Sequence, residues 1–164
     1  MRETAADLQR LQALLDESVA RASPFLRSSF QMPEHSLSAE RLVARLEGSL
    51  TVALATVTAG GEPRAAPIAA LFLRGAFHVP TVAESARARH VAQRPGVSLT
   101  YFEGTDLAVI AHGHAAILDA GHPDFAELDA AQVACGNQSV GDWQGEGVYL
   151  RVEAASLFTF ARNP

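Results

Sequence analysis

Lysine is absent from this 164-residue chain, and all 13 of its fixed cationic side chains are arginines. Acidic residues outnumber them at 18, which gives a formal net charge of −5. Proteins that bind duplex nucleic acid neutralise its phosphates with clustered Lys and Arg. The charge balance therefore excludes nucleic acid as the expected partner.

Cysteine and long apolar runs are also scarce. Cys135 is the single cysteine and allows no internal disulfide, and no apolar run approaches the roughly 20 residues that cross a bilayer. The opening stretch MRETAADLQRLQALLDESVARAS lacks the uninterrupted apolar core of a signal peptide. These absences predict a cytoplasmic protein that does not enter a membrane.

The apolar fraction of 48% is typical of a globular chain, and the length suits a single structural domain with a substantial core. Within it, residues 1–48 are expected to form an N-terminal helical extension. Thr4 can cap a helix over residues 4–22 with an apolar stripe that includes Leu11 and Leu15, and Ser38 can cap a second helix that ends at Gly48. The intervening prolines and serines predict a break.

From Leu50 onward the apolar period changes to two, which predicts a mainly β domain over residues 49–164. Gly60-Gly61 is a stronger hairpin signal than Arg74-Gly75. About seven antiparallel strands, with helices outside them, are expected to close into a barrel. The expected strands are 50–58, 63–73, 76–81, 97–102, 107–118, 147–154 and 156–161, and the expected helices are 84–94 and 122–135, the second with Pro123 in its first turn.

Pro67 interrupts the second strand, PRAAPIAALFL, at a place where a regular strand would donate a hydrogen bond. Proline has no backbone N–H and is confined to sheet edges, bulges and strand starts. Either this strand has an unpaired edge, or something other than a neighbouring strand lies against it.

Four segments appear in an order that resembles the pyridoxamine 5′-phosphate oxidase-like split barrels, which bind flavins. They are LATVTAGGEPRAAPI, FHVPT, SARARHVAQRPGVSL and VYLRVEAASLFTF. The resemblance covers residues 42–118 well and 148–161 more loosely. It implies an antiparallel, Greek-key-like split barrel.

In such barrels the isoalloxazine ring lies at a gap beside the second strand, near the interface of two subunits. The resemblance therefore assigns Pro67, with Ala66 and Ile68 beside it, to the flavin face. It also implies a homodimer, for which strand segments such as LFL and VYL would supply apolar surface. The alternative from the residues alone is a proline on an unpaired edge strand.

The segment TVAESARARH supplies candidates for a phosphate site: Thr81 at a strand end, Ser85 at a helix start and Arg87 in the first turn. A helix N-terminus with a hydroxyl and a guanidinium makes an anion cradle. The resemblance places the cofactor phosphate on Ser85 and Arg87, with Arg64 as a third candidate. The alternative is a solvated basic helix face.

The chain departs from true pyridoxamine phosphate oxidases, which carry a lysine where this sequence has Ala69 and end in an Arg-containing segment where it has FTFARNP. The Ala-rich second strand and the SARARH helix look more like the branch that uses a deazaflavin coenzyme, so the expected cofactor is FMN or coenzyme F420. It implies an oxidoreductase that acts on an unidentified small molecule and needs no catalytic side chain. The alternative function is a non-catalytic carrier of a flavin or haem.

The remaining candidates are histidines, Cys135 and Trp143. His112 and His114 share a strand, but no carboxylate or cysteine cluster completes a ligand set, so no metal site is predicted. His78 and His90 would be either structural residues or axial ligands of haem. Cys135 is expected to be a packed apolar residue, and Trp143 to anchor its loop.

Overall fold

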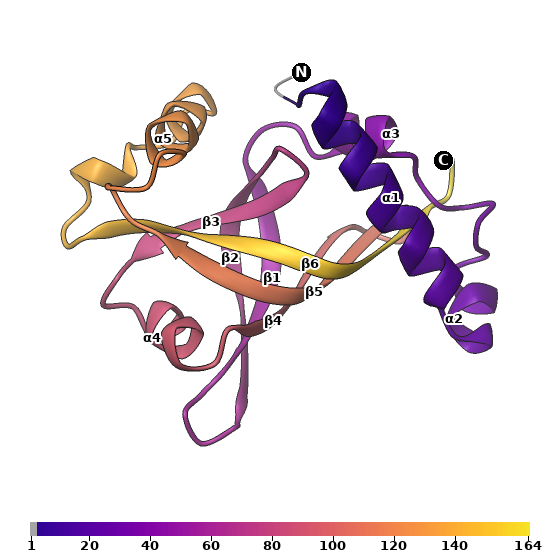
Figure 1. The fold of residues 1–164 in the computed structure, drawn as a ribbon, viewed down its shortest axis with the longest axis horizontal. Coiled ribbons are helices and arrows are strands. Elements are labelled where there is room, and N and C mark those ends of the chain that lie inside the picture. The colour runs from indigo at the N-terminus through magenta and orange to yellow at the C-terminus, as the bar shows by residue number, and fades with distance from the viewer. Residues whose placement is uncertain (1–2) are drawn as a thin grey trace.

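Six antiparallel strands close into a barrel in the order β1-β2-β3-β6-β5-β4 (Figure 1). The structure is a computed structural model and describes residues 3–164. The strands are β1 (Leu50–Val57), β2 (Pro63–Leu73), β3 (Ala76–Val82), β4 (Gly96–Glu103), β5 (Leu107–Leu118) and β6 (Gly147–Ala161). The helices are α1 (Ala5–Arg21), α2 (Pro24–Ser29), α3 (Ala39–Arg45), α4 (Ala86–Gln93) and α5 (Phe125–Ala134), with a 3₁₀ turn at Val140–Asp142.

The barrel is split because two of its strand pairings are short. β1 pairs with β4 only through residues 53–55, and β2 pairs with β3 only through residues 71–73 beside their hairpin. β2 therefore pairs with β1 on one side over residues 63–70, and among the described strands none pairs with its other edge there, which is called the free edge of β2 below. The predicted antiparallel split barrel is confirmed.

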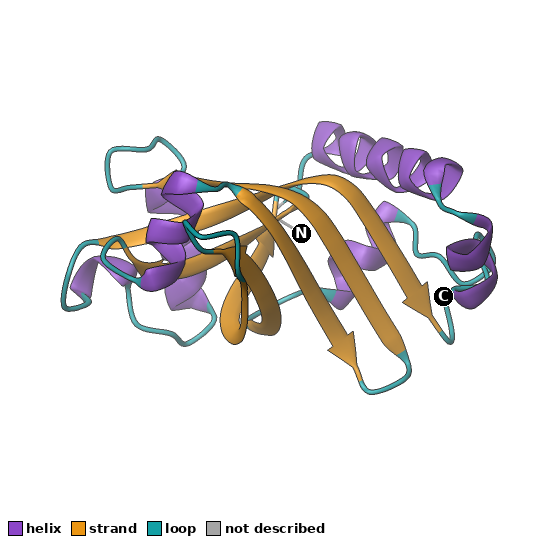
Figure 2. Cartoon of the chain, turned by 90° about the horizontal axis from the view of Figure 1, so that it is seen from below, coloured by secondary structure: helices purple, strands orange, loops and turns teal. Residues whose placement is uncertain are grey.

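The two strands expected at the end of the chain are one 15-residue strand, β6, so the barrel has six strands rather than about seven. The interruption at Ala155 is a bulge in β6, opposite the register shift between His112 and Gly113 of β5. A Cβ added at Gly113 would lie 2.0 Å from the Glu153 carbonyl oxygen, so this close approach requires glycine. Figure 2 shows the resulting long, curved strands.

The tightest hairpin is made by Arg74-Gly75, not by Gly60-Gly61. Arg74 and Gly75 both have positive φ, 53° and 77°, as a two-residue primed turn requires. The Arg74 N–H donates to the Glu3 carboxylate at 3.2 Å, and its guanidinium pairs with Asp124 and Glu127. Tertiary contacts thus support a turn that local preference disfavours, whereas Gly60-Gly61 lies in a longer loop.

Helix α1 packs against the barrel along β6, which it crosses in Figure 1. Leu11 and Leu15 are buried in the same core as the barrel residues, and the Leu157 N–H of β6 donates to Ser18 Oγ at 2.9 Å. α3 begins after the predicted cap, Ser38. A short helix, α2, occupies part of the segment where only a break was expected. The division into a 1–48 extension and a 49–164 barrel stays a prediction.

A second, smaller core lies between α5 and the outer face of the sheet. It is formed by Leu73, Leu118, Leu128, Val140 and Tyr149, with Trp143 packed against it as a loop anchor. Tyr149 is fully buried, and this desolvation raises the pKa of its phenol. α5 begins at Phe125, so Pro123 precedes the helix instead of lying in its first turn.

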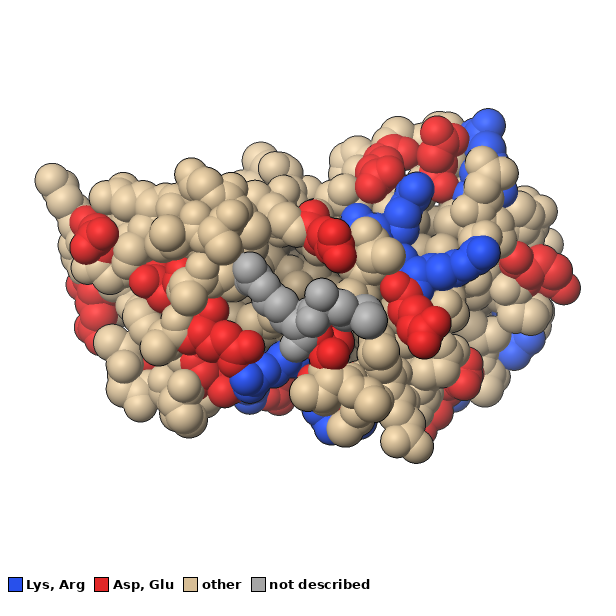
Figure 3. Space-filling model, turned by 90° about the horizontal axis from the view of Figure 1, so that it is seen from above, with Lys and Arg blue, Asp and Glu red and all other residues tan. Residues whose placement is uncertain are grey.

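On the face seen in Figure 3, acidic and basic side chains are interspersed. Among residues 3–164, none of the helices combines the length and the apolar composition that crossing a membrane requires.

Thr4→Ala should destabilise the fold by about 1 kcal/mol, because Thr4 and Asp7 form a capping box at the start of α1. The Thr4 N–H donates to the Asp7 carboxylate at 2.8 Å and is the main reason that the pKa of this carboxyl lies below its usual range. Urea unfolding at neutral pH measures the effect, with exposed Gln9→Ala as the control. Equal midpoints for the two variants would contradict it.

Candidate cofactor site

A cavity of about 460 Å³ lies where the start of α4 approaches strands β1 and β2. Its wall combines the first turns of a helix with the part of β2 that has a free edge. The lining residues are Leu54, Thr56, Arg64, Ala65, Ala66, Ser85, Ala86, Arg87 and His90. This is the region to which the sequence assigned a cofactor.

Three of the predicted phosphate ligands meet through hydrogen bonds at the start of α4. Ser85 is the N-cap, and its Oγ accepts from the Ala88 N–H at 3.2 Å. Thr81, at the end of β3, donates its hydroxyl to Ser85 Oγ at 3.0 Å, and Arg87 Nη1 donates to Thr81 Oγ1 at 3.3 Å. The two hydroxyls and the guanidinium therefore form one connected group.

Two arginines line this cavity although the chain as a whole is acidic. Arg64 and Arg87 line it, whereas its described lining includes no Asp or Glu. Arg64 pairs with Glu62 in the exposed hairpin loop at 2.6 Å, and Arg87 forms no ion pair within residues 3–164. Guanidinium groups beside a helix N-terminus favour an anion, so the residues present fit a phosphate group.

The free edge of β2 explains the proline in the middle of this strand. Pro67 is exposed and lies opposite Ala53 of β1, in the stretch where no strand of residues 3–164 pairs with the other edge of β2. A residue without an N–H leaves no unpaired donor at such an edge. Both sequence interpretations, an edge proline and a ligand-facing proline, agree with this geometry.

The predicted residues thus fall into three places. Arg64, Ala66, Ser85 and Arg87 line the cavity, and Thr81 lies directly behind Ser85 and Arg87. Pro67 and Ile68 continue along β2 beyond the cavity, Pro67 exposed and Ile68 packed against the core. The assignment of these residues to a cofactor stays a prediction.

Sequence reasoning missed the pair formed by His90 and Thr56. His90 lies one turn after Arg87 on α4, and its Nδ1 is 2.9 Å from Thr56 Oγ1 of β1. The spacing of three residues places His90 and Arg87 on one helix face, which was a usable signal. The partner on β1 is 34 residues away and could not be identified from local sequence.

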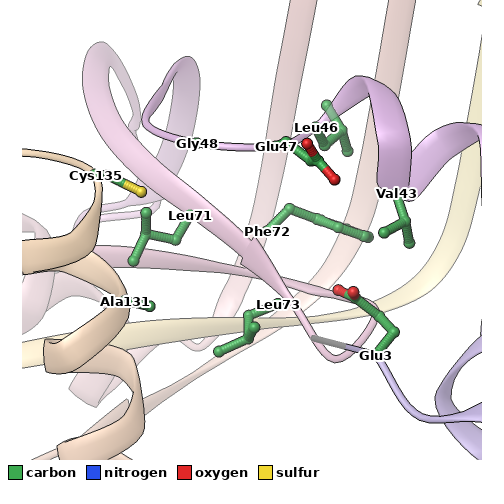
Figure 4. Close-up of a pocket in the computed structure, with 10 residues that line it drawn as sticks. All are labelled: Glu3, Val43, Leu46, Glu47, Gly48, Leu71, Phe72, Leu73, Ala131 and Cys135. Carbon is green, nitrogen blue, oxygen red and sulfur yellow. The ribbon is translucent and has the colours of Figure 1, made fainter. Parts of the chain in front are cut away.

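Other cavities lie elsewhere, and two of them include residues considered in the sequence analysis. Figure 4 shows one of about 250 Å³ between α3, β2 and α5, with Leu71 and half-buried Cys135 on the side of α5 and Glu47 on the side of α3. A larger one, of about 780 Å³, is lined in part by His112 and His114. Within residues 3–164, no group of three or more His, Cys, Asp or Glu side chains could hold a metal ion.

The pyridoxamine 5′-phosphate oxidase family model matches residues 38–159, which is most of the chain and includes every residue of the cavity. The chain belongs to the pyridoxamine 5′-phosphate oxidase family. The resemblance noted in the sequence is therefore confirmed. None of the curated proteins matches the sequence.

Solved structures share the fold of this family member at low sequence identity. A conserved hypothetical protein of Mycobacterium tuberculosis has a TM-score of 0.65 and 20% identity, over 80% of this chain and 89% of that one. An F420 reductase has a TM-score of 0.56 and 16% identity, over 70% and 93%. An FMN-binding, pyridoxamine 5′-phosphate oxidase-related protein of Nostoc punctiforme has 0.51 and 14%, over 70% and 76%.

Proposed function

We propose that this protein is a flavin- or deazaflavin-dependent oxidoreductase that acts on a small molecule. The observation that carries the proposal is the convergence of Thr81, Ser85 and Arg87 on an electropositive cavity beside the free edge of β2. The family, together with neighbours described as FMN-binding and as an F420 reductase, supports a phosphorylated flavin or deazaflavin as the occupant.

The chain's own residues would bind and orient the cofactor, which supplies the hydride chemistry when bound. Ser85, Arg87 and the first N–H groups of α4 would hold the phosphate, because they present donors and positive charge without a competing carboxylate. Ala66 and Pro67 would lie against the ring system, because the edge of β2 is open there. No side chain is assigned as an acid or a base.

Absorption spectra of the purified protein mixed in turn with FMN, coenzyme F420 and haem test this proposal. We expect FMN or F420 to bind, and the bound cofactor, once reduced, to be reoxidised by a small-molecule acceptor faster than free cofactor. If no acceptor reoxidises the bound cofactor faster than free cofactor, the protein is a carrier instead of an oxidoreductase. Binding of haem alone, or of none of the three, would contradict the assignment.

A homodimer remains part of the proposal, although its expected surface is different from the one inferred from the sequence. The segments LFL and VYL are largely covered within one chain, with Leu73 and Tyr149 buried under α5. The free edge of β2 and the exposed side chain of Phe102, 61% accessible, are the surfaces that we propose for the contact. Two-fold pairing is the commonest way to bury such surfaces.

Sedimentation equilibrium at micromolar concentration should therefore give about twice the mass of one chain. Phe102→Ser should shift the equilibrium toward monomer if this residue lies in the contact, whereas Phe25→Ser, at an exposed position in α2, should not. A wild-type monomer that still binds its cofactor would contradict the homodimer.

A further inference from the structure

We propose that His90 is a ligand-binding residue that donates a hydrogen bond from Nε2 to the cofactor phosphate, and that Thr56 positions it. The inference rests on the proposed function, because it needs an anionic ligand in the 460 Å³ cavity. It adds a third donor group, from the middle of α4, to the two at the start of that helix.

The imidazole of His90 lies in the wall of the cavity. His90 follows Arg87 by one helical turn, and both residues line the cavity together with Arg64 of β2. Residues three apart on a helix are surface neighbours. An anion bound between Arg64 and Arg87 is therefore within reach of His90. The described residues that line the cavity include no Asp or Glu that would repel this anion.

A contact with Thr56 restrains the ring of His90. His90 Nδ1 lies 2.9 Å from Thr56 Oγ1, and Thr56 is only 3% exposed on β1, a strand of the barrel wall. This contact ties one edge of a partly exposed ring to a rigid element. A donor held in this way loses less conformational freedom on binding than a free surface side chain does.

The contact with Thr56 also bears on the tautomer of His90. Neutral imidazole carries one N–H, and the hydrogen bond made by one nitrogen determines which nitrogen carries it. When the Thr56 hydroxyl donates to Nδ1, the proton lies on Nε2, which forms no hydrogen bond elsewhere in the described chain. In this tautomer the pair presents one unused N–H, which is the complement of a phosphate oxygen.

A purely structural pair is the competing explanation, since the same contact fastens α4 to β1. The two explanations differ in what they predict for FMN and for riboflavin, which lacks the phosphate. A fastening contact affects stability, and the affinities for both flavins change together. A phosphate donor affects FMN alone.

The test is the dissociation constant of FMN and of riboflavin, measured by flavin fluorescence for the wild type and four variants. A hydrogen bond to a charged group predicts that His90→Leu weakens FMN binding roughly 10-fold or more and leaves riboflavin unchanged. His90→Gln keeps a donor near the Nε2 position and should retain most of the affinity. Thr56→Val should cost about 3- to 10-fold, because the ring loses its orientation, and Thr56→Ser should restore binding.

Arg87→Ala separates failure of this inference from failure of the proposed function. If Arg87→Ala weakens FMN selectively while His90→Leu and Thr56→Val do not, the role of His90 is overturned and the cofactor site stands. If none of the three variants discriminates FMN from riboflavin, the phosphate does not bind in this cavity, and both the role of His90 and the proposed placement of the cofactor fail.

Long-range ¹H–¹⁵N spectra of the histidine rings give a second readout that needs no flavin, with the His90 signal identified by its loss in His90→Gln. Inorganic phosphate should shift the Nε2 signal of His90 in the wild type and in Thr56→Ser, and less in Thr56→Val. A chain that binds no flavin and shows no such shift would overturn the inference.

Discussion

Replacing Arg87 with alanine should weaken FMN binding by about 10- to 150-fold and leave riboflavin binding nearly unchanged. Arg87 forms no ion pair within residues 3–164, and its Nη1 contacts only the hydroxyl of Thr81, so its charge is available to a ligand. A hydrogen bond to a charged group contributes roughly 1.5–3 kcal/mol, and each 1.4 kcal/mol is a factor of ten in affinity. Titration of the two flavins by fluorescence measures the difference.

Arg94→Ala is the matched control, because Arg94 follows the same helix at its other end. Its guanidinium is exposed and donates to the Ala59 carbonyl at 2.9 and 3.2 Å, outside the cavity. It removes the same charge from the chain and should have little effect on either flavin. Equal losses for Arg87→Ala and Arg94→Ala would mean that the basic residues of α4 are only a solvated face.

The parts of this fold that the sequence predicted are those determined by neighbouring residues. Thr4, Ser38 and Ser85 each cap a helix by accepting a hydrogen bond from an N–H three residues away. In β1, buried residues alternate with more exposed ones, because one face of the strand packs on the core. Ser85, Arg87 and Thr81 also lie within six residues of one another. Their meeting at the start of α4 could therefore be inferred from the sequence alone.

The parts that sequence reasoning missed depend on distant contacts. The Arg74-Gly75 turn is supported by Glu3 and by Asp124, which are 71 and 50 residues away. The bulge in β6 keeps a single strand continuous because Gly113 of β5 lets the two backbones approach. The contact between His90 and Thr56 likewise joins a helix to a strand that precedes it by 34 residues.

The environment of His78 makes the stability of this protein dependent on pH. His78 lies on β3 beside Arg151 of β6, is only 4% exposed, and its Nδ1 has no hydrogen-bond partner in the described chain. Burial lowers the pKa of this imidazole to about 4, and the positive charge of Arg151 acts in the same direction. The folded protein therefore holds His78 neutral where the unfolded chain would protonate it.

The sign follows from proton binding. The unfolded histidine titrates at about 6.5, so the full contribution of neutral His78 is present above that pH. As the pH falls toward 4, the unfolded state binds a proton that the folded state does not, and the free energy of unfolding decreases. With these two pKa values the loss is about 2 kcal/mol between pH 7.5 and pH 5, and about 3 kcal/mol in total below pH 4.

Urea unfolding of the wild type and of His78→Gln at pH 7.5, 6.5, 5.5 and 5.0 tests this expectation. Glutamine does not titrate, so the free energy of unfolding of the variant should fall by about 2 kcal/mol less than that of the wild type over this range. His114→Gln is the control, because His114 is exposed on β5. The free energy of unfolding of this variant should depend on pH as that of the wild type does. The comparison uses slopes, so it holds even where His78→Gln lowers stability at every pH. Parallel curves for His78→Gln and the wild type would show that His78 is protonated in the folded protein as readily as in the unfolded chain.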